Sequence, residues 1–489
     1  MPQESASPRA QLGRRSMLAA MAAGAGLAGA AASVAAPSSA RAATPADAAA
    51  RPVDLPAADP VDPADLPLTG GSQFPIGVFW PPPPLQISTA RYQEIADAGF
   101  TFILNGNYVW DATGIRYSLA AAQQTGLKVL VSGDPLEAAL AGNFWIQGDP
   151  SGNHPQISPQ DAATSLAAVL STYKGYSSFA GLDLADEPAA DRFTTLAALV
   201  ALCRQAAPTA LPYINFRRIG QPWGAWGTAG MDAATYTTYI QQAVDTVRPS
   251  VLSYDRYPLN ADGTDDPQYF QNWAIMRQAS LRSGIPAWIY LQSVQYAGHR
   301  LPTAAELAWQ VNISLAYGAK GIQYFTYWTP DPSRGSGFVP AQALITVAGE
   351  RTALYDAAKR LNTGWLAPAG GQLKPLVSES VVHANDNPLP AGAIAFAPDD
   401  LLAEVSGDAV VLGRFAAVGA SLSDDRTLLV ANRSHSAPAT ARVRLKPAAV
   451  ATVSRFDAVA ASWLPKAGAA HLDVHLPPGG AALYRLAAK

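Results

Sequence analysis

Two adjacent carboxylates, Asp186 and Glu187, stand at the end of a short apolar segment and directly before Pro188. The hydrophobicity of residues 179–185 is typical of a strand that is buried on both faces in a parallel sheet. Because proline cannot donate to a sheet ladder, the strand must stop here and a loop must begin. Two carboxylates at such a strand end suit general acid–base chemistry. They equally suit the start of the following helix, where acids stabilise the helix dipole, and this stretch alone leaves both interpretations open.

The elements that would position this pair repeat along the chain as short apolar segments followed by longer helical patterns. The predicted strands span residues 75–80, 100–104, 127–132, 179–186, 211–216, 251–254, 286–291 and 321–327, and the last predicted helix spans 340–361. A long loop is predicted between the third strand and the helix that begins near Ser158. Eight such units predict a closed (β/α)8 barrel, an α/β fold whose catalytic face lies at the carboxyl ends of the strands. An open doubly wound sheet is the alternative, but it would normally carry a glycine-rich loop after its first strand, where this chain has Trp80 and four prolines.

The chain divides into four predicted segments, residues 1–43, 44–72, 73–365 and 366–489. The first resembles a twin-arginine export signal, because Arg14 and Arg15 precede a soft apolar run and a small-residue cleavage site. The second is rich in Ala, Pro and Asp and is predicted to be a disordered linker. The third holds the barrel, and the fourth has the short alternating segments of a small all-β sandwich. We therefore expect a secreted protein, located outside the cell or in its envelope.

The composition excludes several other classes of function. The net charge is −3 and the Lys and Arg residues are spread along all 489 positions, so no nucleic-acid partner is expected, and no membrane association once the signal is removed. Cys203 is the only cysteine, which excludes an internal disulfide. The sequence has no metal-ligand spacing of His and Cys, no Gly-x-Ser-x-Gly elbow, no phosphate loop and no dinucleotide fingerprint. We expect neither a metal nor a cofactor.

The carboxyl ends of the predicted strands carry Trp, Tyr, Asn, Gln, Arg and carboxylate side chains. Sugar-binding sites use this set, because aromatic faces stack on the C–H surfaces of sugar rings and planar polar groups bond to hydroxyls. We expect a carbohydrate substrate, and the residues predicted to bind it are Trp80, Asn107, Asp134, Asp186, Asn215, Arg217, Trp223, Tyr254, Gln292, Tyr327 and Trp328. For Trp80 and Trp328, packing at the mouth of the barrel is the alternative to stacking on a sugar.

The predicted barrel resembles the clan A glycoside hydrolases. The resemblance rests on Asp186-Glu187-Pro188 after the fourth strand, where that clan has Asn-Glu-Pro, on Trp328 at the end of the eighth strand, and on the appended sandwich. It implies that Glu187 is the general acid/base of a glycosidase. It also implies that Asp186 replaces an Asn that contacts the sugar 2-hydroxyl, so that this contact would change character.

The sequence departs from the clan at the seventh strand, where the nucleophilic Glu is expected and Gln292 stands instead. An amide cannot attack an anomeric carbon, so a second carboxylate must come from elsewhere. Asp255, at the end of the sixth strand, is the best candidate, and Asp134, Asp183 and Asp186 are weaker ones. Retaining enzymes hold their two carboxyls about 5–5.5 Å apart and inverting ones about 6.5–9.5 Å, so the sequence leaves the stereochemistry open, although the missing strand-seven acid favours inversion.

The predicted function is that of a secreted glycosidase with catalytic residues Glu187 and Asp255. The main alternative is a carbohydrate-binding barrel that has lost catalysis, of which Gln292 would be the trace. A transglycosidase or a lyase-like barrel that acts on polysaccharides is a third possibility. The sugar, the linkage, the endo or exo mode of action and the oligomeric state do not follow from the sequence.

Overall fold

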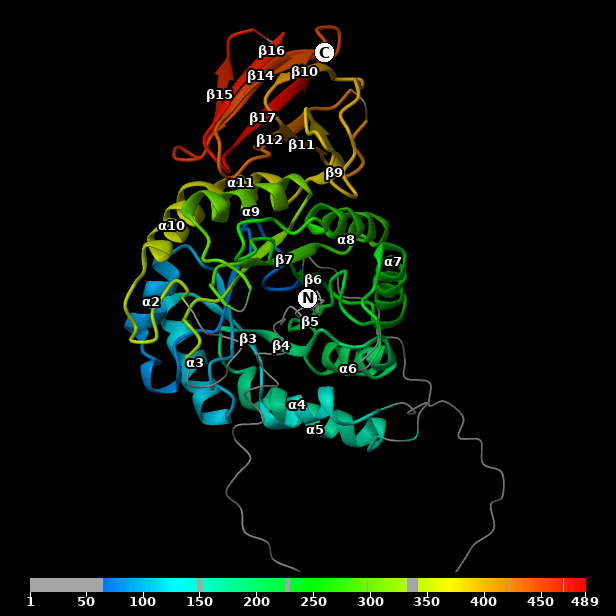
Figure 1. The fold of residues 1–489 in the computed structure, drawn as a ribbon. Helices are drawn as coiled ribbons and strands as arrows, with labels where there is room; N and C mark the ends of the chain where they lie inside the picture. Colours follow the sequence, from blue (N-terminus) through cyan, green and yellow to red (C-terminus); the bar gives the residue numbers. More distant parts are fainter. Residues whose placement is uncertain are drawn as a thin grey trace, which may run out of the picture.

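The computed structural model describes residues 65–146, 152, 154–224, 229–296, 298–331, 342–421, 423–468 and 470–489. It shows a closed barrel of parallel strands surrounded by helices, with an antiparallel domain stacked on one side (Figure 1). This confirms the predicted fold class. The predicted export signal and most of the predicted linker lie outside the described residues.

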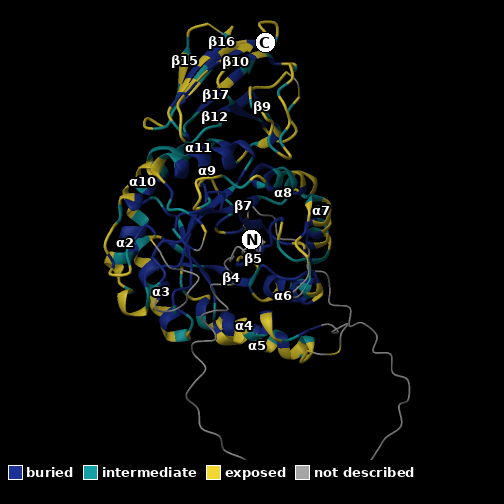
Figure 2. Ribbon diagram, viewed as in Figure 1, coloured by how far each residue is buried: buried dark blue, intermediate teal, exposed yellow. Residues whose placement is uncertain are grey.

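The barrel closes in strand order β1 to β8, with Ile76 of β1 paired to Ile322 of β8. Its strands are β1 Ile76–Phe79, β2 Phe102–Leu104, β3 Lys128–Val131, β4 Phe179–Asp186, β5 Leu211–Phe216, β6 Leu252–Asp255, β7 Ala287–Gln292 and β8 Gly321–Phe325. Nearly every strand residue is buried, as expected for a parallel sheet that is covered by helices outside and by its own side chains inside (Figure 2).

Polar caps at strand-to-helix turns start many of the helices. The helices that cover the barrel are α2 Thr89–Asp97, α3 Ala112–Thr125, α4 Pro135–Gly142, α5 Pro159–Tyr173, α6 Phe193–Ala206, α7 Ala233–Gln242, α8 Tyr269–Ser283, α9 Ala304–Ala316, α10 Ala353–Leu361 and α11 Ala367–Leu373. Ser88, Asp111 and Asp232 accept hydrogen bonds from backbone N–H groups of the first turn, which would otherwise have no partner. At α9, Thr303 and Glu306 bond reciprocally to each other's backbone N–H in a capping box.

Two helical predictions differ from the structure. The region after β3 was expected to be a long loop, but it holds α4, which begins at Pro135 behind the cap Asp134. The helix expected over residues 340–361 is limited to α10, Ala353–Leu361. Short isolated bridges at Gln342 and Ile345 precede it, because this segment pairs with the loops that follow β7 and β8.

The C-terminal domain is a sandwich of two antiparallel sheets, as predicted. One sheet has the order β10-β13-β16 and the other β15-β14-β17-β12-β11-β9. Their bounds are β9 Val377–Ala384, β10 Leu402–Gly407, β11 Val410–Ala416, β12 Arg426–Asn432, β13 Ala439–Leu445, β14 Val450–Asp457, β15 Ser462–Lys466, β16 His471–Leu476 and β17 Ala481–Ala488. In β13 buried and exposed residues alternate strictly, so one face packs on the sandwich core and the other faces solvent.

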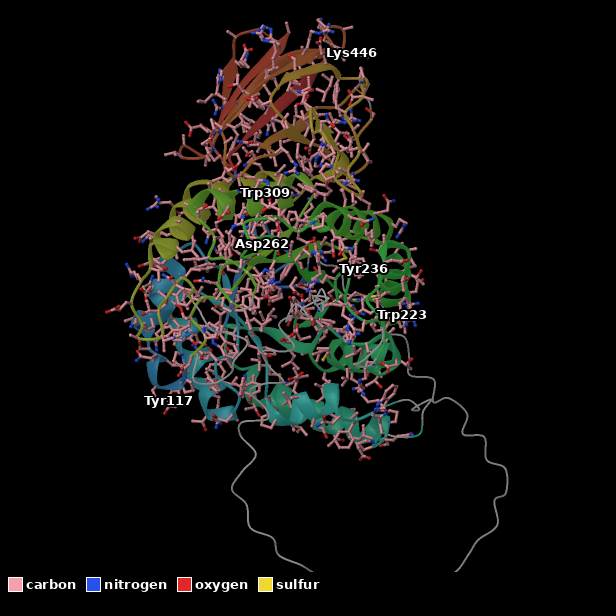
Figure 3. The ribbon with its side chains drawn as sticks, in the orientation of Figure 1. Tyr117, Trp223, Tyr236, Asp262, Trp309 and Lys446 are labelled. Atoms are coloured by element: carbon pink, nitrogen blue, oxygen red, sulfur yellow. The ribbon has the colours of Figure 1, made fainter. Side chains whose placement is uncertain are left out.

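Trp309 of α9 anchors the barrel to the sandwich (Figure 3). Its side chain is buried, and its Nε1 donates to the backbone carbonyl of Arg433, 3.0 Å away in the C-terminal domain. The ring stacks on Tyr269 of α8 at a centroid distance of 5.1 Å. The two domains therefore share a continuous apolar core at this junction. In the described part of the chain, no helix is long and apolar enough to cross a membrane.

Truncation of this anchor should destabilise the protein. Trp309→Ala removes a fully buried indole and its hydrogen bond, which we expect to lower the free energy of unfolding by about 3–5 kcal/mol. Tyr117→Ala, at an aromatic residue that is 66% exposed on α3, serves as the control and should change it by less than about 0.5 kcal/mol. Denaturant unfolding followed by fluorescence measures both values. Equal stabilities for the two variants would contradict the anchoring role.

Candidate active site

Glu187 is held by its own backbone at the carboxyl end of β4. Asp186 lies opposite Asn215 in the parallel register of β4 and β5. The next peptide turns away from the sheet, with a φ of 48° at Glu187, a left-handed conformation that costs energy for a non-glycine residue. Its N–H donates to the Asn215 carbonyl at 2.7 Å, and its carbonyl accepts from Arg217 Nε at 2.9 Å. The two hydrogen-bond partners of this backbone therefore come from β5 and from the residue directly after it.

Asn215 joins the acids of two different strands. Its Nδ2 donates to Asp186 Oδ1 at 3.2 Å and to Asp255 Oδ1, at the end of β6, at 3.1 Å. Its Oδ1 accepts from Ser253 Oγ at 2.9 Å, which fixes the orientation of the amide. Ser253 in turn bonds to the Tyr213 hydroxyl at 2.6 Å. The barrel interior therefore supports the two carboxylates through a chain of buried polar groups.

The environment of Glu187 favours its protonated form. The side chain is only 4% exposed, and burial raises the pKa of its carboxyl well above the ordinary range. The negative charges of Asp255 and then Asp186 raise this pKa further, while a hydrogen bond from Gln221 and the charge of Arg218 offset part of the rise. A carboxylic acid that stays protonated near neutral pH is what a general acid requires.

Asp255 presents an oxygen that the fold does not use. The side chain is fully buried, and its Oδ1 is held by Asn215. Within the residues that the structure describes, Oδ2 has no hydrogen-bond partner. The pKa of the buried Tyr296 phenol is raised, first by burial and then by the charges of Asp255 and Glu187, so this ring lies near both acids. A water molecule or a substrate atom would satisfy the remaining oxygen.

Both predicted sugar-binding tyrosines point away from these acids. Tyr254 precedes Asp255 on β6, and its ring packs on Trp273 of α8 with centroids 5.3 Å apart. Tyr327 packs against Phe100 and against Tyr355 of α10. Both rings are buried between the strands and the outer helices, so neither is positioned to contact a substrate.

The three predicted tryptophans are also occupied by packing. Trp328 is buried beneath the guanidinium of Arg91, which lies 5.4 Å from its ring centroid. Trp80 is fully buried, with a φ of 65° at its backbone. Trp223 is partly buried beside Tyr239 of α7, with centroids 5.9 Å apart and an edge-to-face arrangement (Figure 3). For Trp80 and Trp328 the structure favours the packing role that the sequence left open.

Gln292 at the end of β7 makes a structural set of hydrogen bonds. Its Oε1 accepts from the Leu259 N–H at 2.9 Å, and its Nε2 donates to the carbonyls of Leu259 and Arg300 at 3.1 and 2.7 Å. These bonds tie the loop after β6 to the loop after β7. The amide therefore braces the two loops and has no polar atom left for a substrate.

Four other candidate residues are engaged in hydrogen bonds with nearby parts of the fold. Asp134 caps α4 and accepts from the Tyr173 hydroxyl at 2.5 Å. The Asn107 amide donates to a backbone carbonyl of the proline-rich loop at 2.6 Å. Arg217 donates to carbonyls in the loop that follows β5, in addition to that of Glu187. Asp183 accepts a hydrogen bond from the hydroxyl of Ser132, directly after β3, at 3.0 Å. Of the predicted set, the structure brings together Asp186, Glu187, Asn215 and Asp255.

Four residues near the acids were not among the predicted site residues. Arg218 and Gln221 follow β5, and Tyr296 and His299 follow β7. The ring centroids of Tyr296 and His299 lie 4.9 Å apart, and both rings are buried. Their positions directly after strand ends were a usable signal, since loops at that edge of a barrel carry its site. Among the described residues, no group of His, Cys, Asp and Glu is arranged to hold a metal ion.

The charge of Asp186 gives a pH prediction. Glu187 acts as an acid only while protonated, so activity must fall as the pH rises through its pKa. Asp186→Asn removes a negative charge that raises this pKa, and the alkaline limb of kcat/KM should move to lower pH. Asp191→Asn, at an exposed position beyond the site, is the control and should leave the limb in place. An unchanged limb in Asp186→Asn would show that the two carboxyls do not interact.

The fold and the buried acids define a (β/α)8 barrel protein with a candidate acid–base site at its catalytic face. No family model matches the sequence, and no curated protein matches it. Among solved structures, similar chains include a plant β-glucan endohydrolase (13% identity, 56% of this chain and 98% of that chain, TM-score 0.36) and Parabacteroides merdae β-glucuronidase (10%, 81% and 55%, TM-score 0.35). A third is the C-terminal domain of Legionella pneumophila ChiA (12%, 60% and 98%, TM-score 0.32). Likeness at these TM-scores carries no conclusion about function.

Proposed function

We propose that this protein is a glycosidase in which Glu187 is the general acid and Asp255 is the second catalytic carboxylate. The observation that carries the proposal is the pair itself: Glu187 is a carboxyl whose pKa is raised by burial and then by the charge of Asp255, and Asp255 has an oxygen without a hydrogen-bond partner in the described chain. Two carboxyls in environments that separate their protonation states are the requirement for cleavage of a glycosidic bond.

The proposed reaction uses only groups of this chain and water. Glu187 donates its proton to the glycosidic oxygen as the bond to the anomeric carbon breaks. Asp255 Oδ2 either removes a proton from the attacking water or stabilises the positive charge that develops on the sugar ring. Asn215 holds the other oxygen of Asp255, so that Oδ2 keeps one orientation. The Tyr296 hydroxyl, buried near both acids, supplies a neutral donor for the sugar.

The first experiment is an activity screen with a binding control. Purified protein is incubated with a broad panel of polysaccharides and nitrophenyl glycosides, and new reducing ends or released nitrophenol are measured. The proposal expects turnover of at least one carbohydrate class. Binding to a glycan without turnover would instead favour a carbohydrate-binding barrel without catalytic activity. One observation supports this alternative: Gln292 stands where a strand-seven acid is expected, and it bonds to two loops.

We also propose that the chain is exported through its twin-arginine sequence. Replacing both Arg14 and Arg15 by Lys should retain the protein, uncleaved, inside a bacterial host that has this export route. Cell fractionation and the mass of the mature N-terminus measure the outcome. A double Lys variant that is still exported and cleaved would contradict the proposal.

A further inference from the structure

Arg218 is a buried cation that no carboxylate of the described chain neutralises. The residue is 7% exposed, and none of the described acids forms an ion pair within 4.0 Å of its guanidinium. Within the described chain, its guanidinium makes one hydrogen bond, from Nη1 to the Ile219 carbonyl at 3.4 Å. Nearby Arg256 is different, because it pairs with Asp266. An unpaired buried charge is expensive, and a ligand of opposite charge would remove the cost.

The position of Arg218 links it to the proposed acid. Its backbone N–H donates to Gln221 Oε1 at 2.8 Å, and the Gln221 side chain bonds to Glu187. The charge of Arg218 also offsets part of the rise in the pKa of Tyr296, and after burial it is the next cause of the lowered pKa of His299. The guanidinium therefore lies within electrostatic range of Glu187 and of these two rings. It is not bound to Glu187, since no ion pair joins them.

The other described basic groups near these acids are not available to pair with a ligand. Burial, followed by the charge of Arg218, lowers the pKa of His299 to about 4, so its ring is neutral at neutral pH. Arg256 is neutralised by Asp266. The head group of Arg217 is bound to backbone carbonyls. Among the described residues near the acid pair, Arg218 is the guanidinium whose fork is left for a ligand, and such a fork matches one carboxylate.

We propose that the sugar bound beside Glu187 carries a carboxylate, and that Arg218 pairs with it. The substrate class is then a uronic-acid-containing glycan or glycoside. Arg218 would select the substrate by charge, while Glu187 and Asp255 would act on the bond. For turnover this inference rests on the proposed glycosidase function, but the binding of a uronate does not depend on it.

The test is calorimetric titration of the mature protein with free hexuronic acids and with the matching neutral hexoses at neutral pH. We expect the wild-type protein to bind a uronate at least about tenfold more tightly than its hexose, and Arg218→Gln to lose this preference. Arg218→Lys keeps the positive charge but not the two parallel N–H donors of the guanidinium, and it should keep part of the preference for the uronate. Arg282→Gln, at an exposed arginine of α8, is the matched control and should keep all of it.

Each outcome decides the proposal. Equal binding of uronate and hexose by the wild-type protein overturns it, as does an unchanged preference in a folded Arg218→Gln variant. Tighter binding of a hexose 6-phosphate or 6-sulfate than of the uronate would also overturn it. Hydrolysis of neutral aryl glycosides without uronate binding rejects this inference and leaves the proposed function intact. Uronate binding without hydrolysis of the matching aryl uronosides rejects the proposed function and leaves this inference intact.

Discussion

Glu187→Gln should lower kcat/KM on an unactivated glycoside by about 10²–10⁴-fold, because the amide keeps the size of the side chain but has no proton to donate. The backbone bonds that hold this residue, from its N–H to Asn215 and from Arg217 to its carbonyl, are unaffected by the substitution. Stability should not fall, since the variant also removes a buried titratable group next to two other acids.

The matched control for this variant is Glu350→Gln, at an exposed glutamate outside the barrel interior. Its kcat/KM on the same substrate should equal that of the wild-type protein. Initial rates over a range of substrate concentrations give both values, and thermal unfolding checks that each variant is folded. Near wild-type turnover by Glu187→Gln would remove this residue from the chemistry.

The second large effect is expected at Asp255. Asp255→Asn removes the negative charge of the proposed second catalytic carboxylate, which Asn215 orients. We expect a loss of about 10²–10⁴-fold in kcat/KM. The loss should persist on substrates with good leaving groups, because Asp255 acts on water or on the sugar ring and not on the leaving oxygen. Asp262→Asn, at an exposed acid of the loop that follows β6, is the control and should retain full activity (Figure 3).

Asp255→Asn has a second consequence that separates its role from that of a structural acid. The charge of Asp255 is the largest electrostatic cause of the raised pKa of Glu187, after burial. Its removal should therefore lower the pKa of the Glu187 carboxyl, which ¹³C NMR of labelled glutamate measures directly. An unchanged titration of Glu187 in this variant would mean that the two groups do not share one site.

The barrel was predictable because each strand is a short apolar segment between turn residues, and because closure follows from eight repeated units. The sandwich followed from the change to alternating segments, which β13 shows most clearly. The helix expected over residues 340–361 was too long because apolar residues near its start belong to a segment that pairs with loops at the barrel's edge. Periodicity alone does not separate such a segment from a helical turn.

In the candidate site, the acids were easier to predict than the residues around them. Neighbours along a strand point to opposite sides, so Tyr254 and Asp255 could not both face the interior, and the tyrosine packs on Trp273 instead. The engagement of Gln292 with two loops depends on how those loops fold, which its position in the sequence does not reveal. Arg217 was predicted as a site residue and the adjacent Arg218 was not, because only the three-dimensional structure shows that the head group of Arg217 donates to several backbone carbonyls while that of Arg218 donates to one.

The most direct test of the proton-donor role is the dependence of rate on the leaving group. A series of aryl glycosides with leaving phenols of increasing pKa is hydrolysed by the wild-type protein and by Glu187→Gln, and log kcat/KM is plotted against the phenol pKa. We expect a shallow slope for the wild-type protein and a steep fall for the variant, with the two rates converging on the most acidic phenols, which need no proton. Parallel lines would contradict the assignment of Glu187 as the general acid.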